Sequence, residues 1–308
     1  MIQKEINKFK FDLAKWIPFN DKEVCEKVRK IKKEDITKHS NKDLNIKIIS
    51  DYEFLTLQTF DIFYRIKKAF DEDKRLVLIL PQPHNEYRML AEMINRFGIS
   101  CNKIFTFNMD EYADECGKTP PETWPGSFRY AMLNNFYYRI DEKLRPPINN
   151  IQSPTDKNIV YYGKLIEDLG GADVCYGGIG WSGHLAFIEP DFCFDEHQGD
   201  LEKWKKIGPR IIDLMPFTTL QESLSTEFGS SGDWSFIPPK AATIGPEQII
   251  KARYVSSWNG FIINNKISWA RFVLRLALHG PVTTQIPGSI LQTLKADVFI
   301  KESLASDI

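Results

Sequence analysis

Five consecutive apolar residues, LVLIL at positions 76–80, constrain the fold of this chain more than any other stretch. A strand with one face in water alternates apolar and polar side chains. An uninterrupted apolar run of this length therefore predicts a strand that is buried on both faces. Such strands occur in parallel sheets that helices cover on both sides, so the run predicts an α/β protein.

Further strand and helix patterns alternate along the chain. We predict strands over residues 44–49, 103–107, 173–176, 260–263 and 296–300, and helices over residues 52–70, 87–97, 127–138, 158–169 and 267–278. This alternation predicts a mostly parallel, doubly wound, Rossmann-like sheet with helices on both faces. The sequence contains no internal repeat and no low-complexity linker.

Two segments do not follow this alternation. Residues 1–43 are rich in lysine and glutamate but carry aromatic residues such as Phe11 and Trp16. We interpret them as a partly helical N-terminal extension on an α/β domain of residues 44–308, with a solvated appendage as an equal alternative. Residues 191–239 are polar and contain glycine, serine and proline, so they form either a lid over a site or a surface excursion.

The composition argues against several kinds of partner. The 308 residues include 40 basic and 41 acidic side chains, and a net charge of −1 favours neither nucleic acid nor an acidic membrane. The five cysteines form no CxxC pair, so we expect a reducing cytoplasm and neither a zinc site nor a disulfide framework. No apolar run is long enough to span a membrane, and the N-terminus is too charged for a signal peptide.

The stretch 174–190, VCYGGIGWSGHLAFIEP, joins a short apolar strand to a glycine turn, a histidine and a carboxylate. The glycines are Gly177, Gly178, Gly180 and Gly183. Such a run is typical of a backbone that turns tightly or approaches a ligand closely. His184 follows at once and Glu189 lies near the end, a combination more typical of a functional site than of packing. Strand ends are also where ligands bind in α/β sheets.

Two other predicted strands end in polar residues. Residues 81–86, PQPHNE, follow the first buried strand, and residues 108–112, NMDEY, follow the next one. The carboxyl ends of parallel strands lie at one edge of a sheet, so we expect these segments and the glycine turn to converge. The crevice would contain the acids and bases His84, Asp110, Glu111, His184 and Glu189. A histidine shuttles protons near neutral pH and a carboxylate can remove a carbon-bound proton, which favours proton-transfer chemistry.

Simpler interpretations of these residues stay open. Asp110 and Glu111 could begin a helix or lie in a turn, the commoner place for such dipeptides. His184 could be a structural histidine with satisfied hydrogen bonds. A metal site formed by His184, Glu189 and His197 lacks a recognised ligand spacing, and we predict no metal and no cofactor.

Residues 178–183 match the GxGxxG pattern of dinucleotide-binding sites. The match is weak, because Pro190 soon interrupts the long helix that this pattern should begin. The pattern also lies in the middle of the chain and not in a first βαβ unit, so we do not favour a nucleotide.

Three segments resemble the glucosamine-6-phosphate deaminase family, within a wider group that includes 6-phosphogluconolactonase. They are TFNMDEY at residues 106–112, GGIGWSGHLAFIEP at 177–190 and GPVTTQIPGSILQ at 280–292, in the order of the family. The resemblance covers residues 44–300, and the Glu-Pro ending of the second segment favours the deaminase branch.

The resemblance implies an isomerisation of an aminosugar phosphate from aldose to ketose with loss of ammonia. By this analogy Asp110 moves a proton between C2 and C1, His184 assists ring opening, and Glu189 orients and charges that histidine. The implied substrate-binding residues are Gln82, His84, Asn85, Glu111, Gly178, Gly180, Ser182, Gly183, Lys266 and Arg271. We further expect a cytoplasmic homo-oligomer whose partner is a small sugar or sugar phosphate.

The chain departs from the family pattern at several of these positions. The family usually has an aspartate two residues before the histidine, where this chain has the uncharged Ser182. In place of a glycine-rich phosphate loop, residues 81–87 contain two prolines, which lack backbone donors, and a negatively charged glutamate. The lid arginine has no clear match near residues 215–220, and the phosphate-binding lysine corresponds to Lys266 or Arg271. These departures predict weak binding of phosphate and of 6-phosphosugars.

Three alternative functions stay open. The first is an isomerase of an unphosphorylated or differently charged sugar, without deamination. The second is a lactone hydrolase, in which His184 activates water, and the third is a non-catalytic sugar-binding protein. Release of ammonia, release of acid from a lactone, and binding without turnover distinguish these functions.

Overall fold

The structure of this protein is a computed structural model that describes residues 11–82, 86–190, 199–225, 231–262 and 267–308. The strands are β1 (Leu44–Ile49), β2 (Leu76–Leu80), β3 (Ile104–Asn108), β4 (Asp110–Ala113), β5 (Ile151–Gln152), β6 (Val174–Gly177), β7 (Arg210–Asp213), β8 (Lys240–Thr243), β9 (Val255–Asn259) and β10 (Ala296–Lys301). The α-helices are α1 (Lys22–Arg29), α2 (Phe54–Asp71), α3 (Tyr87–Phe97), α4 (Phe128–Asn135), α5 (Ile159–Asp168), α6 (Leu201–Trp204), α7 (Pro216–Ser225), α8 (Pro246–Lys251), α9 (Ala270–His279) and α10 (Glu302–Ala305). None of the helices in these ranges is long and apolar enough to cross a membrane.

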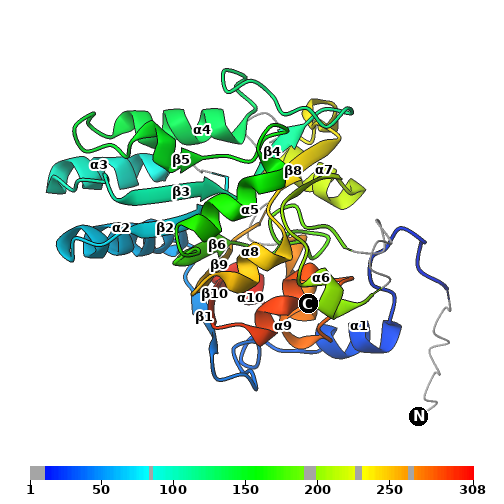
Figure 1. Cartoon of the computed structure of the whole chain (residues 1–308). Coiled ribbons are helices and arrows are strands. Elements are labelled where there is room, and N and C mark those ends of the chain that lie inside the picture. The colour runs from blue at the N-terminus through cyan, green and yellow to red at the C-terminus, as the bar shows by residue number, and fades with distance from the viewer. Residues whose placement is uncertain (1–10, 83–85, 191–198, 226–230, 263–266) are drawn as a thin grey trace, which may run out of the picture.

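A seven-stranded parallel sheet forms the centre of the molecule, in the order β1-β10-β9-β6-β2-β3-β5 (Figure 1). The apolar strand β2 lies inside this sheet between β6 and β3, and all five of its side chains are buried. The structure therefore confirms the predicted α/β fold and its mostly parallel sheet.

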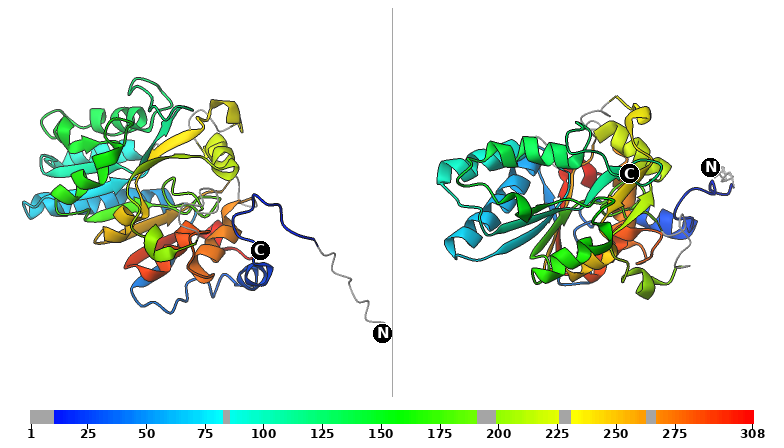
Figure 2. Two further views of the ribbon diagram at one scale, coloured as in Figure 1. Left: turned by 45° about the vertical axis from the view of Figure 1, so that its right-hand side comes forward. Right: turned by 45° about the horizontal axis from the view of Figure 1, so that its top comes forward.

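The side chains of β2 enter two separate apolar clusters, because successive residues of a strand point to opposite faces. Leu76, Leu78 and Leu80 belong to a cluster that also contains buried residues of α2, α3 and α4. Val77 and Ile79 belong to a second cluster, with residues of α1, α5, α8 and α9. Helices thus cover both faces of the sheet, as Figures 1 and 2 show.

One predicted strand is wrong. We expected a strand at residues 260–263, of which position 263 lies outside the described residues, but β9 ends at Asn259 and the described residues that follow it are not in a strand. The sequence of β9, VSSWN, is too polar to be detected by apolar periodicity. Its polar groups are buried because they bond to one another: Trp258 Nε1 donates to Ser256 Oγ at 2.9 Å, and Asn259 Nδ2 donates to Ser257 Oγ at 3.1 Å.

A second, antiparallel sheet in the order β4-β8-β7 is absent from our sequence-based prediction. The chain enters it directly from β3 at Met109, whose N–H donates to the Leu80 carbonyl while its own carbonyl accepts from Ile244 N–H, both at 2.9 Å. Asp110 and Glu111 therefore lie in a strand, and not at the start of a helix or in a turn. The described part of the predicted lid segment includes β7, which pairs with β8, and α7, which lies near β8 in Figure 1.

The N-terminal extension packs on the C-terminal part of the chain, where α1 lies against α9 (Figure 2). Arg275 of α9 is fully buried and holds the two ends together. Its guanidinium donates to the carbonyls of Ile31 at 2.9 Å, Ala305 at 2.9 Å and Ser306 at 3.0 Å, and to that of Arg271 at 3.2 Å.

We predict that Arg275→Leu lowers the free energy of unfolding by about 3 kcal/mol, because backbone carbonyls at both chain ends lose their donor. Urea denaturation followed by circular dichroism measures the change. The control is Lys30→Ala, which removes an exposed ion pair with Glu26 at 3.0 Å and should change the value by less than about 0.5 kcal/mol. An equal effect of the two substitutions would contradict the linking role of Arg275.

Candidate active site

The order of the central sheet places β6, β2 and β3 side by side, so their carboxyl ends meet at one edge. The glycine segment follows β6 and Asp110 follows β3, as predicted. Helix α7 packs against both segments, because its side chains bond to His184 of the first and to Tyr112 of the second. The site is therefore built from two strand ends and one helix.

The imidazole of His184 is buried and held by two hydroxyl groups. Its Nδ1 lies 2.9 Å from Ser182 Oγ and 3.0 Å from Thr218 Oγ1. The Ser182 hydroxyl donates to Glu189 Oε2 at 2.9 Å, and Met215 N–H donates to Glu189 Oε1 at 3.0 Å. A chain of hydrogen bonds thus connects the carboxylate to the histidine through the serine.

These bonds assign the protons of the histidine ring. The Ser182 hydroxyl donates its single proton to Glu189, so its oxygen can only accept from Nδ1–H. In a neutral ring the Nε2 atom then carries the free lone pair. Glu189 acts on His184 through Ser182, because the direct distance from Nδ1 to Oε2 is 3.7 Å.

The glycines of the segment have steric reasons to be glycine. A Cβ on Gly180 would lie 1.9 Å from Nε2 of His184, and a Cβ on Gly178 would lie 2.5 Å from the Trp258 carbonyl oxygen. Gly183 has φ +91°, in the left-handed region that favours glycine. These glycines, for which we predicted substrate contacts, thus have packing roles of their own: they fold the segment around its own histidine and against β9.

Asp110 is only 6% exposed and lies among other carboxylates. Burial, and then the negative charges of Glu222 and Glu111, raise the pKa of Asp110 well above its usual value. Glu111 is among the site residues that the sequence predicted. The sequence did not identify Glu222, whose buried carboxylate comes from α7.

Glu111 has a structural role. Its carboxylate accepts from Tyr112 N–H at 2.9 Å and Phe128 N–H at 3.0 Å through Oε1, and from Arg129 N–H at 2.9 Å and the Ser127 hydroxyl at 2.7 Å through Oε2. Three of these donors belong to the first turn of α4 and its cap. Because protein groups occupy both oxygens, we assign Glu111 to the cap of α4 in place of the predicted substrate contact.

The other predicted residues are less central. His84, Asn85, Lys266 and His197 lie outside the described residues. Gln82 is half-buried just after β2. Arg271 donates through Nε to the Ser303 carbonyl of α10 at 3.0 Å, next to β10, which is separated from β6 by β9. Within the ranges that the structure describes, no group of three or more His, Cys, Asp or Glu side chains is arranged to hold a metal ion.

Sequence reasoning missed the residues that α7 contributes. Thr218, Gln221 and Glu222 are all buried and follow the i, i+3, i+4 spacing of one helix face. The polar spacing of these residues was visible in the sequence, but the sequence does not say which face of the helix is buried.

Asn108, at the end of β3, is a further residue that the sequence did not single out. Its buried Nδ2 has no hydrogen-bond partner among the described residues.

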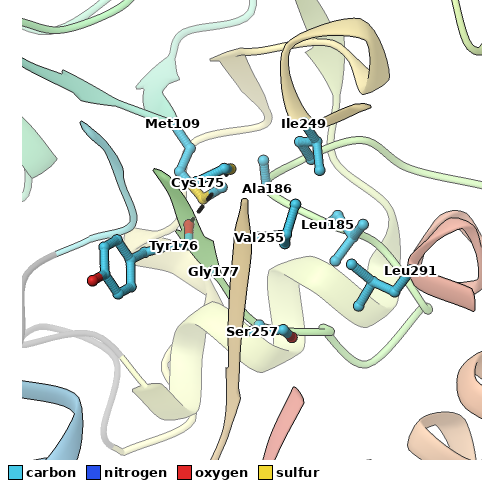
Figure 3. A pocket seen from close by; sticks show the side chains of 11 residues that line it. Met109, Cys175, Tyr176, Gly177, Leu185, Ala186, Ile249, Val255, Ser257 and Leu291 are labelled. Carbon is cyan, nitrogen blue, oxygen red and sulfur yellow. Dashed lines mark hydrogen bonds between the residues drawn. The ribbon is translucent and has the colours of Figure 1, made fainter. Parts of the chain in front are cut away.

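A small apolar cavity lies behind the glycine segment and is not the substrate site (Figure 3). Its walls include Met109, Cys175, Leu185 and Leu291, and its volume of ≈ 10 Å³ is barely enough for one water molecule. Burial raises the pKa of Cys175 to about 12, so the thiol stays neutral and carries no nucleophile.

Comparison with curated proteins decides the family. The chain is 32% identical over 202 residues to the glucosamine-6-phosphate deaminase of Caenorhabditis elegans, in a match that covers 62% of this chain and 66% of that protein. It is 30% identical over 213 residues to the glucosamine-6-phosphate deaminase of Lachnoclostridium phytofermentans, and there the match covers 68% and 78%. The chain belongs to the glucosamine-6-phosphate deaminase family. A scan against models of protein families finds no match.

Solved structures show that the fold is shared with the wider group. A monomeric glucosamine-6-phosphate deaminase superposes with a TM-score of 0.65 at 22% identity, over 84% of this chain and 98% of that one. The 6-phosphogluconolactonase of Thermotoga maritima superposes with a TM-score of 0.56 at 15% identity, over 84% and 99%. The family and the fold that the sequence predicted are therefore both confirmed.

We predict that Gly180→Ala displaces the imidazole of His184, because the new methyl group would occupy the position next to Nε2. The histidine ring signals should shift in NMR spectra, and the free energy of unfolding should fall by about 1–3 kcal/mol. The control is Gly208→Ala, whose Cβ would meet only Glu247 Oε2 at 3.8 Å. Unshifted ring signals in Gly180→Ala would show that the segment can move aside.

The raised pKa of Asp110 predicts that this residue destabilises the fold near neutral pH. Below the unfolded-state pKa of Asp110, near 3.8, the carboxyl is protonated in both states and does not weaken the fold. As the pH rises toward the higher folded-state pKa, the unfolded chain ionises more readily than the folded one, so the free energy of unfolding falls. Calorimetry should show that Asp110→Asn melts more than about 2 °C above wild type at pH 7 and that the gain disappears near pH 4. A lower melting temperature at both pH values would contradict this assignment.

Proposed function

We propose that this protein is a sugar-phosphate deaminase and isomerase, which converts a 2-amino-aldose phosphate and water into the ketose phosphate and ammonia. One observation supports the proposal: a buried aspartate and a buried histidine both lie near α7, whose Thr218 contacts the histidine and whose Glu222 raises the pKa of the aspartate. These are the base and the proton shuttle that the reaction needs, and the chain is a member of a family named for this reaction.

His184 is suited to open the sugar ring. Its Nε2 lone pair takes the proton of the anomeric hydroxyl, the bond between C1 and the ring oxygen breaks, and the imidazolium returns a proton to that oxygen. The positive charge on the ring is transient. Ser182 and Thr218 hold Nδ1 of the ring in place, and the carboxylate of Glu189 lies behind Ser182.

Asp110 is suited to the carbon proton. The carboxylate removes the proton from C2, the electron pair forms the C1–C2 double bond, and the protonated amine of the substrate gives a proton to the aldehyde oxygen, so that an enolamine forms. Asp110 then returns its proton to C1, which leaves an iminium ion at C2. Water adds to C2, ammonium leaves, and the ketose remains. A raised pKa makes Asp110 a stronger base than an exposed aspartate once it is ionised.

The phosphate is the less supported part of the substrate. Helix α7, PFTTLQESLS, contains no arginine and no lysine at the position where the family has its lid arginine. This observation favours an unphosphorylated aminosugar as the second candidate. Weak phosphate binding, cytoplasmic location and homo-oligomeric assembly all stay predictions.

The test is ammonia release from glucosamine 6-phosphate and from glucosamine, run in deuterated water with NMR detection of label at C1. Wild type should release ammonia and form ketose, either with solvent label at C1 or by internal transfer of the C2 proton. Asp110→Asn should still bind the sugar but lose at least about 100-fold in rate, because the amide keeps the shape and loses the basicity.

Four outcomes would change the proposal. Wild-type rates in Asp110→Asn would remove the proton-transfer assignment. Release of acid from 6-phosphogluconolactone without release of ammonia would make the protein a hydrolase, and sugar binding without either reaction would make it a binding protein. Turnover of glucosamine alone would select the unphosphorylated substrate.

A further inference from the structure

Glu222 is a buried carboxylate that the mechanism above does not use. It is 4% exposed and is the seventh residue of the ten-residue helix α7. Its Oε2 accepts from the Tyr112 hydroxyl at 2.9 Å, and its Oε1 accepts from Gln221 Nε2 at 3.2 Å. Both donors are neutral, so the described hydrogen bonds bring no positive charge to this carboxylate.

Glu222 lies near both reactive residues, because its charge raises the pKa of Asp110 and His184 acts on the pKa of Glu222. Thr218 and Glu222 are four residues apart and share one face of the helix, and Thr218 lies 3.0 Å from His184 Nδ1. Gln221 on the same side accepts from Trp181 N–H in the glycine segment at 2.7 Å. Successive residues of a strand alternate, so the Tyr112 side chain that reaches Glu222 lies on the same face of β4 as Asp110.

Asp110 and Glu222 therefore form a pair of buried acids. The charges that raise the pKa of Asp110 come from Glu222 and Glu111, and both are negative. Glu111 accepts its hydrogen bonds from Tyr112 and from the start of α4, which leaves Glu222 as the acid that can act together with Asp110. Two buried carboxylates repel each other, and a cation placed between them favours the ionised form of both.

We propose that Asp110 and Glu222 together bind the protonated amine of an aminosugar, so that the site selects amino sugars over the corresponding hydroxy sugars. An ammonium group has three donors and no acceptor, which suits two carboxylates. The inference rests on the proposed function, in which Asp110 acts at C2. The amine is bonded to that same carbon, so a carboxylate beside Asp110 lies where the amine must be.

The test is calorimetric titration at one pH with two pairs of probes, glucosamine and glucose, and glucosamine 6-phosphate and glucose 6-phosphate. Each pair differs only in the group on C2. Wild type should bind the amino member at least about 10-fold more tightly, as expected of a hydrogen bond to a charged group. Glu222→Gln should bring the two affinities within about 2-fold while leaving that of the hydroxy member unchanged.

Two further variants separate amine recognition from a structural role. Glu111→Gln removes a neighbouring buried carboxylate whose partners are all protein groups, and should keep the ratio of affinities. Glu222→Asp keeps the charge but shortens the side chain, so it should lower the ratio only in part. It also serves as the second test if Glu222→Gln does not fold.

The inference is overturned if wild type binds both members of each pair equally, or if Glu222→Gln keeps the ratio or weakens both members alike. The ammonia assay separates this failure from a failure of the proposed function. Ammonia release with an unchanged ratio in Glu222→Gln rejects amine binding by Glu222 and keeps the deaminase. An amino preference that depends on Glu222, without ammonia release, keeps the binding site and rejects the deaminase.

Discussion

The contacts of α7 with two separate segments are the constraint on which the site depends. One face of this helix reaches His184 through Thr218 and the backbone of Trp181 through Gln221, and it reaches β4 through Glu222. The central sheet alone brings the ends of β6 and β3 to the same edge. The helix fixes how their side chains face each other, and it does so with polar groups that are buried and satisfied.

Burial of acids gives this site its chemical character. Asp110 and Glu222 are both buried, and burial is the main reason why the pKa of each is raised. A carboxyl group in such a place is a stronger base than one in water, but the fold loses stability when it ionises. This is the usual relation between stability and function at a buried catalytic group.

The histidine is supported differently from the acids. Where the family usually has an aspartate, this chain has Ser182. Its hydroxyl is hydrogen-bonded both to Glu189 and to the imidazole of His184, so it connects the carboxylate to the ring. The serine fixes the proton on Nδ1 without a charge in direct contact with the imidazole. Thr218 adds a second hydroxyl at the same nitrogen. The ring orientation thus depends on the hydroxyl groups of Ser182 and Thr218, and the carboxylate of Glu189 contacts the ring only through Ser182.

The sequence by itself determined the class of fold, the family, and the place of Asp110 and His184 at strand ends. These follow from local patterns: the apolar run of β2, the glycines around His184, and the alternation of strands and helices. Only the tertiary structure decided which carboxylates act together. Glu111 is next to Asp110 in sequence, yet it caps α4, whereas Glu222 is 112 positions away and reaches Tyr112 beside it. Sequence spacing fixes which residues share one strand or helix face, but the partner across a packed interface depends on how whole elements meet.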